Sequence, residues 1–247
     1  MSYDNKYKII EKTLNVLKEC NIHCFPINVI QILEHYDYEL ISYQSLKNTH
    51  PDLYAASMAF SEDAYYDMAH RRIFYNRQKP IGRIRFSLMH ELGHIMLEHD
   101  GTCQYQEVEA NLFASHMLAP RMAIHYARPD DEEQASKLFG MTLTAARTAL
   151  MDHTAWHTHI RYCKMNSIDH AMYQHFYDKR LECFVWRDSH CPHCQKRLVN
   201  TLRLYCDRLC FRENKNFLTE YGGSMPVITP LSYSILERIS DPQLLMT

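Results

Sequence analysis

The chain has 247 residues, of which 46% are apolar and 23% are charged. This composition is that of a globular protein with a full core, and it excludes a disordered or fibrous chain. A net charge of −2 gives no indication of nucleic-acid binding at the level of the whole chain. Residues 1–6 lack the apolar core of a signal peptide, and no apolar run approaches the ~20 residues of a membrane span. We therefore expect a cytoplasmic protein, with no membrane partner, whose nine cysteines are thiols or metal ligands.

The N-terminal part of the chain predicts two helices followed by short strands. Apolar residues at helical spacing predict an amphipathic helix over residues 4–20, and Asn28 can cap a second helix that ends near His35. Four segments then read as strands: residues 38–43, 53–60, 64–68 and 71–75. We expect a small antiparallel sheet whose edge could bind an extended substrate by strand addition.

The stretch from Phe86 to Leu97 contains the pattern HExxH. On a helix, His90 and His94 lie one turn apart on one face, where both imidazoles can hold one metal ion. Zinc fits best, because a catalytic zinc site uses three protein ligands and a water. Glu91 would act as general base while the zinc-bound water attacks a carbonyl. The alternative is an amphipathic helix with two surface histidines, which the apolar surroundings of the motif disfavour.

A further helix is predicted over residues 107–118, and it would supply the third ligand. Glu107 shares a face with small alanines that let this helix approach the HExxH helix closely. Asn111, one turn later, would orient a ligand from behind it. Glu109 points about 160° away from Glu107 at ~100° per residue and is the second choice as ligand.

Two nearer residues are weaker candidates for the third ligand. Asp100 has the spacing of a metzincin ligand, but the glycine that should turn the chain before it is absent. His99 would face away from the metal. Both rank far below Glu107.

Several of these motifs occur in the order found in one peptidase family: residues 72–76, 83–94, 107–114 and 118–120. From about residue 25 to 150 the sequence resembles the ImmA/IrrE family of metallopeptidases. The resemblance implies a zinc-dependent endopeptidase that often acts on a transcriptional repressor. By position, His90, His94 and Glu107 match the ligands and Glu91 the general base. Met89 and Ala119 replace commoner family residues, but neither removes a catalytic group.

Residues 133–150 resemble a helix-turn-helix. Gly140 makes the turn and Thr142 caps the second helix. A DNA-reading version would want clustered basic side chains along that second helix, which offers Arg147 and little else. We favour a packing role, with direct nucleic-acid binding as the less favoured alternative.

Four grouped cysteines predict a second metal site: Cys191, Cys194, Cys206 and Cys210. The spacing CxxC and then CxxxC resembles a treble-clef or ribbon-type zinc knuckle, in which residues 198–205 can form a hairpin. Four thiolates would close the shell of this zinc, so its role would be structural. A redox CxxC motif would not explain the second pair.

Together these patterns predict an α+β protein. A mostly helical metallopeptidase core with a small antiparallel sheet beside the HExxH helix would span residues 1–130. A helix-turn-helix-like region (131–182), a four-cysteine zinc knuckle (183–220) and a tail (221–247) would follow. We expect one catalytic and one structural Zn²⁺, and the resemblance to the ImmA/IrrE family implies a protein substrate that is a regulatory DNA-binding protein. The alternative is a non-catalytic regulatory protein that binds DNA or protein through the helix-turn-helix-like segment and the knuckle.

Overall fold

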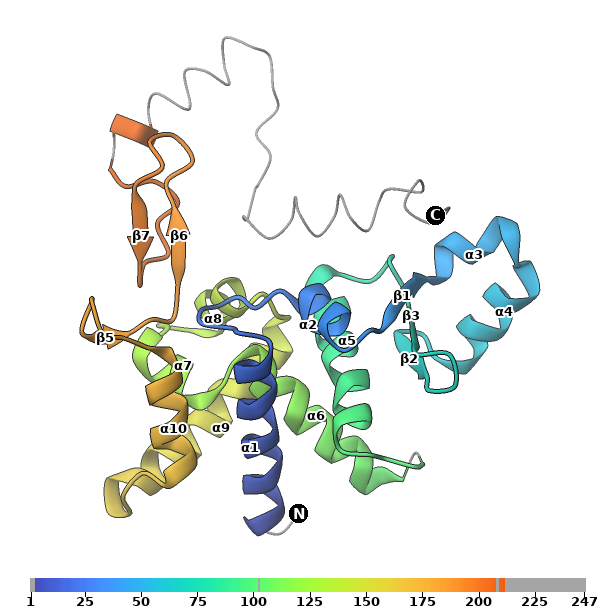
Figure 1. Ribbon diagram of the computed structural model, residues 1–247, viewed down its shortest axis with the longest axis horizontal. Coiled ribbons are helices and arrows are strands. Elements are labelled where there is room, and N and C mark those ends of the chain that lie inside the picture. Colours follow the sequence, from blue (N-terminus) through green and yellow to red (C-terminus); the bar gives the residue numbers. More distant parts are fainter. Residues whose placement is uncertain (1–2, 102, 208, 212–247) are drawn as a thin grey trace.

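The computed structural model describes residues 3–101, 103–207 and 209–211. The predicted tail (221–247) and the last part of the predicted knuckle (212–220) lie outside these residues. The described chain is α+β and mostly helical, as predicted (Figure 1). Its elements are α1 (Tyr3–Glu19), α2 (Val29–His35), β1 (Glu39–Ser42), α3 (Tyr43–Thr49), α4 (Pro51–Phe60), β2 (Ala64–Asp67), β3 (Arg72–Tyr75), α5 (Ile81–Met96), α6 (Gln104–Leu118), α7 (Arg121–Ala127), α8 (Glu132–Phe139), α9 (Leu143–Tyr162), α10 (Ser167–Phe176), β4 (Tyr177–Asp178), β5 (Cys183–Phe184), β6 (Asp188–His190) and β7 (Arg197–Val199).

The first two predicted helices are confirmed as α1 and α2. The side chain of Asn28 caps α2 by accepting hydrogen bonds from the backbone N–H groups of Ile30 and Gln31. One face of α1 is buried through Leu14 and Leu17. Helix α1 packs against both α6 and α10, so it joins the HExxH region to the later helices.

The strand predicted over residues 53–60 is wrong, because Pro51–Phe60 form α4. Pro51 stands in the first turn, where its missing N–H breaks no helical hydrogen bond. Asp52 lies in the same turn, where a carboxylate is favoured by the helix dipole. The alanines that follow have high helix propensity. These local preferences outweigh the aromatic residues on which the strand prediction rested.

The sheet beside α5 has the strand order β1-β3-β2. β2 and β3 form the predicted antiparallel pair, with Tyr66 opposite Ile73. β1 joins in parallel, with Leu40 opposite Ile73, because α3, α4 and β2 lie between β1 and β3 in the chain. Within the described strands, β2 is therefore an edge strand with one side unpaired.

Helices α5 and α6 pack against each other at close range (Figure 1). Leu88 and Leu92 of α5 are buried in the main hydrophobic core. A methyl group on Gly93 would lie 3.1 Å from the Cα atom of Ala110 in α6. Small residues on both helices thus bring the two backbones together, as the sequence indicated for the α6 side.

The helix-turn-helix-like pair is α8 and α9. Gly140 follows α8 with a φ of 64°, and the Thr142 side chain caps α9 by accepting from the N–H of Ala145. Ala135 and Leu138 belong to the same hydrophobic cluster as Leu88 and Leu92 of α5, so α8 packs onto the core that carries the HExxH helix. The domain boundary at residue 130 stays a prediction.

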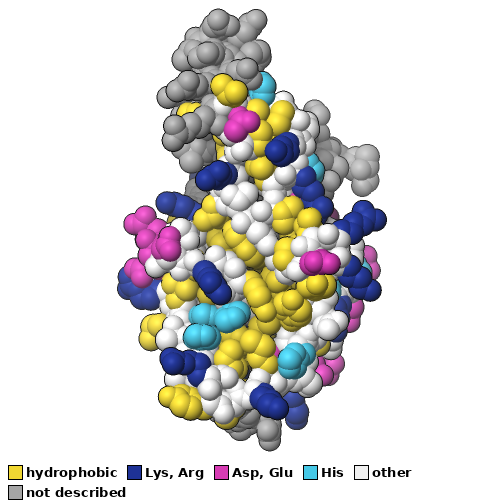
Figure 2. Space-filling view, turned by 90° about the vertical axis from the view of Figure 1, so that its left-hand side faces the viewer, with side chains coloured by type: hydrophobic (Ala, Val, Ile, Leu, Met, Phe, Trp, Pro, Cys, Tyr) yellow, Lys and Arg dark blue, Asp and Glu magenta, His cyan; other side chains and the backbone are white. Residues whose placement is uncertain are grey.

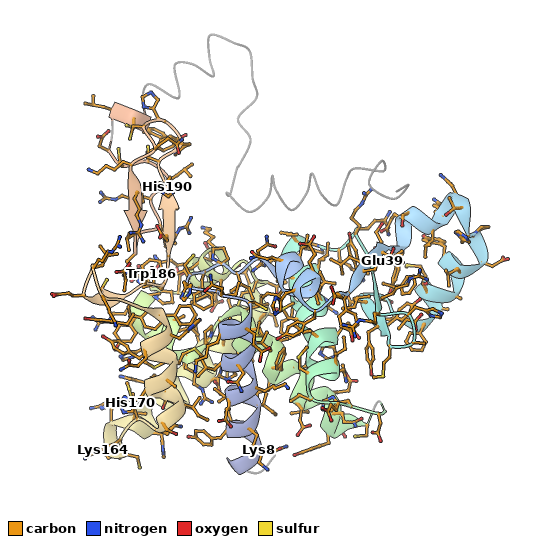
Figure 3. The ribbon with its side chains drawn as sticks, in the orientation of Figure 1. Lys8, Glu39, Lys164, His170, Trp186 and His190 are labelled. Atoms are coloured by element: carbon orange, nitrogen blue, oxygen red, sulfur yellow. The ribbon has the colours of Figure 1, made fainter. Side chains whose placement is uncertain are left out.

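The last described elements leave the helical body as a hairpin. β6 and β7 pair antiparallel, with Ser189 opposite Leu198, and project away from α7 and α10 (Figure 1). The predicted hairpin over residues 198–205 is wrong, since the turn lies between β6 and β7 instead. His190 in the hairpin and Glu39 in strand β1 of the main sheet lie far apart (Figure 3).

Among the described residues we find no helix with the length and hydropathy of a membrane span.

Candidate metal centre

Helix α5 places His90 and His94 on one face, as the spacing predicted. Their Nε2 atoms are 3.1 Å apart. Glu107, in the first turn of α6, lies across from them. Its two carboxylate oxygens are each 3.3 Å from one Nε2 atom, Oε2 from His90 and Oε1 from His94. The structure thus brings together the three residues predicted as ligands of the first zinc.

These distances can be compared with the geometry of a zinc site. Tetrahedral ligands at ~2.0–2.1 Å from zinc are separated from one another by roughly 3.3 Å. The observed separations of 3.1 to 3.3 Å match that value. Two imidazoles and one carboxylate are also the donor set of known catalytic zinc sites, in which a fourth position stays open. The residues therefore fit a zinc ion.

Burial keeps the two histidines in the form that binds metal. Burial, followed by the neighbouring charge of His90, lowers the pKa of His94 to about 4. Burial also lowers the pKa of His90, although Glu107 opposes this shift. Both imidazoles are therefore neutral near pH 7, as metal ligation requires.

Glu91 lies beside this set and is buried. Burial and the charge of Glu107 raise its pKa to about 8, while a hydrogen bond from the backbone of Tyr66 opposes the shift. A bound dication would lower this pKa again, because it favours the carboxylate form. Glu91 also lines the same cleft as His90, His94 and Glu107.

Asn111 takes the position predicted for it behind a ligand. Its Oδ1 atom is 3.1 Å from the Nδ1 atom of His90. With the Nε2 atom of His90 directed at the metal set, Nδ1 carries the hydrogen and donates it to Asn111. This hydrogen bond fixes the orientation of the His90 ring.

The side chains that lie behind His94, the other histidine of the metal set, were not predicted from the sequence. The Nδ1 atom of His99 is 3.0 Å from the Nδ1 atom of His94, and the Nε2 atom of His99 is 3.0 Å from Oε2 of Glu109. Glu109 is therefore directed at His99, while Glu107 joins the metal set. α5 ends at Met96, and Glu98 adopts a φ of 55°, so the chain turns back and brings His99 behind His94. No glycine marks this turn, so the sequence offered no signal for it.

A cleft of about 1130 Å³ opens over the metal set. One wall is β2, and the other comes from α5 and the segment that follows it. Two exposed apolar side chains also line the cleft: Phe60, the last residue of α4, whose ring centroid is 5.0 Å from that of Tyr65, and Met68, which directly follows β2. The candidate centre is thus open to a large molecule along an edge strand.

The four grouped cysteines also come together. Cys191 and Cys194 lie in the turn between β6 and β7, and the Sγ atom of Cys206 is 3.4 Å from the Sγ atoms of both Cys194 and Cys210. All four sulfur atoms lie within 4.8 Å of one another. Tetrahedral thiolates at ~2.3 Å from zinc are about 3.8 Å apart, so this four-cysteine set fits a structural zinc.

One thiol of this set is already favoured as a thiolate. Burial would raise the pKa of Cys191, but hydrogen bonds from the backbone of Cys194, Cys206 and His193 lower it to about 6. Backbone N–H groups aimed at sulfur favour the charged form that a metal needs. The pKa of Cys210 is raised instead, by its hydrogen bond with Cys206 and by burial, and the pKa of Cys206 is raised to about 11, so a bound metal would have to displace protons from these two thiols.

Comparison with known proteins bears on the first of these sites. Residues 50–151 match the family model described as the IrrE N-terminal-like domain, Peptidase_M78. The matched segment contains α5 and α6, with the whole HExxH pattern and Glu107. A search of curated proteins found no match. The four-cysteine set lies outside the matched residues.

Proposed function

We propose that this chain, whose residues 50–151 belong to the ImmA/IrrE family of peptidases, is a zinc-dependent endopeptidase. The observation that carries the proposal is the metal set of His90, His94 and Glu107, at 3.1 to 3.3 Å separations within an open cleft. Glu91, buried beside the set, supplies the base that peptide hydrolysis needs.

The residues of the site divide the chemistry between them. His90, His94 and Glu107 would hold the ion, which when bound would polarise the scissile carbonyl and activate a water. The Glu91 carboxylate would accept a proton from the attacking water and return it to the leaving amide nitrogen. Asn111 would keep the His90 ring in place through the hydrogen bond at Nδ1.

We propose that the substrate binds as an extended segment along β2. The free edge of this strand offers unpaired backbone groups beside the metal set, and strand addition uses such groups. Phe60 and Met68, 73% and 58% exposed, would contact apolar side chains of the substrate. A short peptide with the sequence of the cleavage site should compete, and absence of competition would count against edge binding.

The resemblance to the ImmA/IrrE family supports a regulatory DNA-binding protein, such as a transcriptional repressor, as the substrate. The reducing cytoplasm is the compartment we propose, since it keeps the four-cysteine set reduced and able to bind metal. We further propose two zinc ions per chain, one at each site.

The competing function, a non-catalytic DNA- or protein-binding protein, has less support. Arg147, near the start of the second helix in the helix-turn-helix-like pair, forms an ion pair with Glu132. Arg197 of the hairpin pairs with Asp188. On the face below the hairpin, basic side chains are dispersed among apolar and acidic ones (Figure 2). None of these features resembles a phosphate-binding surface.

The variant Glu91→Gln separates the two functions. It should retain zinc and fold, because the side chain keeps its size, yet lose cleavage by at least about 10²-fold since the base is gone. The same variant should hold its substrate and allow its recovery from cells as a complex. Full biological activity of Glu91→Gln would refute the peptidase proposal and leave the binding function as the better account.

A further inference from the structure

A row of buried side chains stands behind one metal ligand. His99 and Glu109 are 5% and 8% exposed, and they extend from His94 in the order His94, His99, Glu109 with two contacts of 3.0 Å. Glu109 also accepts hydrogen bonds from Asn5 of α1 and Tyr105 of α6. The row therefore begins at the metal set and ends on the N-terminal helix.

The position of His94 fixes the direction of the hydrogen bonds in this row. Its Nε2 atom faces His90 and Glu107, so Nε2 presents its lone pair and Nδ1 carries the hydrogen. Nδ1 of His99 must then accept that hydrogen. The remaining nitrogen of His99, Nε2, carries a hydrogen in turn and donates it to Glu109. Every donor in the row meets an acceptor when all three groups keep these forms.

We infer that His99 and Glu109 are positioning residues that act through His94, the ligand they hold in one tautomer and one orientation. This inference rests on the zinc site of the proposed function. The Glu109 carboxylate would increase the electron density that His94 offers to the metal, because its negative charge is relayed through a polarised imidazole. The support for the two histidine ligands is unequal: His90 is held by the neutral amide of Asn111, and His94 by a charged row.

The burial of these groups favours this role over simple packing. A carboxylate and an imidazole at such depth are costly unless their hydrogen bonds are satisfied. Aliphatic side chains would fill the same space between α5 and α6 at lower cost. The polar row is instead complete and directed at one nitrogen of a metal ligand, as expected for groups that orient the ligand.

The test compares zinc affinity in the full-length chain by competition with a chelator. His99→Leu should weaken zinc binding at the His90 site about 10- to 100-fold, the usual effect of losing such a partner. His99→Gln can still accept from His94 and donate to Glu109, and it should recover part of the loss. His170→Leu is the control, because His170 is exposed on α10, away from α5 (Figure 3). Cobalt absorption distinguishes the two sites, since thiolate ligands give a charge-transfer band that the His90 site lacks.

Each outcome decides one question. If the zinc affinity of the His99→Leu variant is within twofold of that of the unmodified chain, the inference is overturned. If the His99→Gln variant binds zinc as weakly as the His99→Leu variant, the inference is also overturned, because hydrogen bonding by residue 99 would then not matter. If the unmodified chain binds no zinc at the His90 site, the proposed function fails together with the inference. If zinc binding behaves as expected while no peptide is cleaved, the proposed function fails and the positioning role stands.

Discussion

Arg85 is a buried guanidinium that links three parts of the chain. It is 2% exposed and donates hydrogen bonds to the carbonyl oxygens of Gly140 at 2.7 Å, Ile27 at 2.9 Å and Phe139 at 3.3 Å. Burial lowers its pKa to about 10, so it remains charged near neutral pH. Through this side chain, α5 holds the end of α8 and the segment before α2.

Arg85→Met should therefore destabilise the fold by roughly 3 kcal/mol, because the carbonyl oxygens lose their donors inside the protein. Denaturant unfolding measures this change. Arg83→Met is the matched control two residues away: Arg83 pairs with Asp63 at the surface, and its loss should cost at most about 1 kcal/mol. Equal effects of the two substitutions would contradict the role assigned to Arg85.

His153 should make stability depend on pH. Burial, then the charges of His125 and His157, lower its pKa to about 4, whereas the unfolded chain has the ordinary value of ~6.5. Between these values the unfolded state binds more protons, so stability falls as pH decreases from about 6.5 to about 4 and is level above that range. Because the side chain is partly exposed, we expect a contribution of about 1 kcal/mol.

Thermal unfolding across that pH range measures the effect. His153→Gln should flatten the curve by this amount, and His170→Gln, at an exposed position, should leave it unchanged. A curve for His153→Gln that parallels that of the unmodified chain would show that His153 does not titrate as proposed.

At the scale of elements, the spacing of α5 and α6 decides whether a metal site exists. Gly93→Ala would place a methyl group 3.1 Å from Cα and 3.2 Å from the carbonyl oxygen of Ala110. The helices must separate, which should cost ~1–3 kcal/mol and move Glu107 away from the two histidines. We expect weaker zinc binding together with a lower melting temperature. Gly101→Ala is the control, since its methyl group would meet only a flexible Gln106 side chain at 3.5 Å.

The elements also show where sequence reasoning succeeds. The HExxH helix, its partner helix and the caps at Asn28 and Thr142 depend on short-range spacing, and all were predictable. The approach of Glu107 to α5 was predictable from small residues on one helix face. The row behind His94 was not, because it depends on a turn at Glu98 whose sequence carries no turn signal. The parallel pairing of β1 was missed because it depends on α4, which was predicted as a strand.

At the scale of the whole molecule, the two metal sets lie on separate parts. The four-cysteine set belongs to the projecting hairpin and the segment that follows it, and the His90 set lies on α5 and α6, with the sheet beside α5 (Figure 1). Elemental analysis of the purified chain should give two zinc ions. The double variant Cys194→Ser/Cys206→Ser should bind one zinc ion, held at the His90 site. Loss of both ions would show that the two sites depend on each other.

The contact between Asn5 and Glu109 has a consequence for synthesis on the ribosome. These residues are 104 positions apart, and their hydrogen bond completes the row that holds His94. A nascent chain has its first helix long before α6 emerges, so the HExxH helix is made while its support is still missing. The site can therefore assemble only after α6 has left the exit tunnel and docked on α1. A nascent chain that has not yet exposed α6 would lack both Glu107 and the row that holds His94.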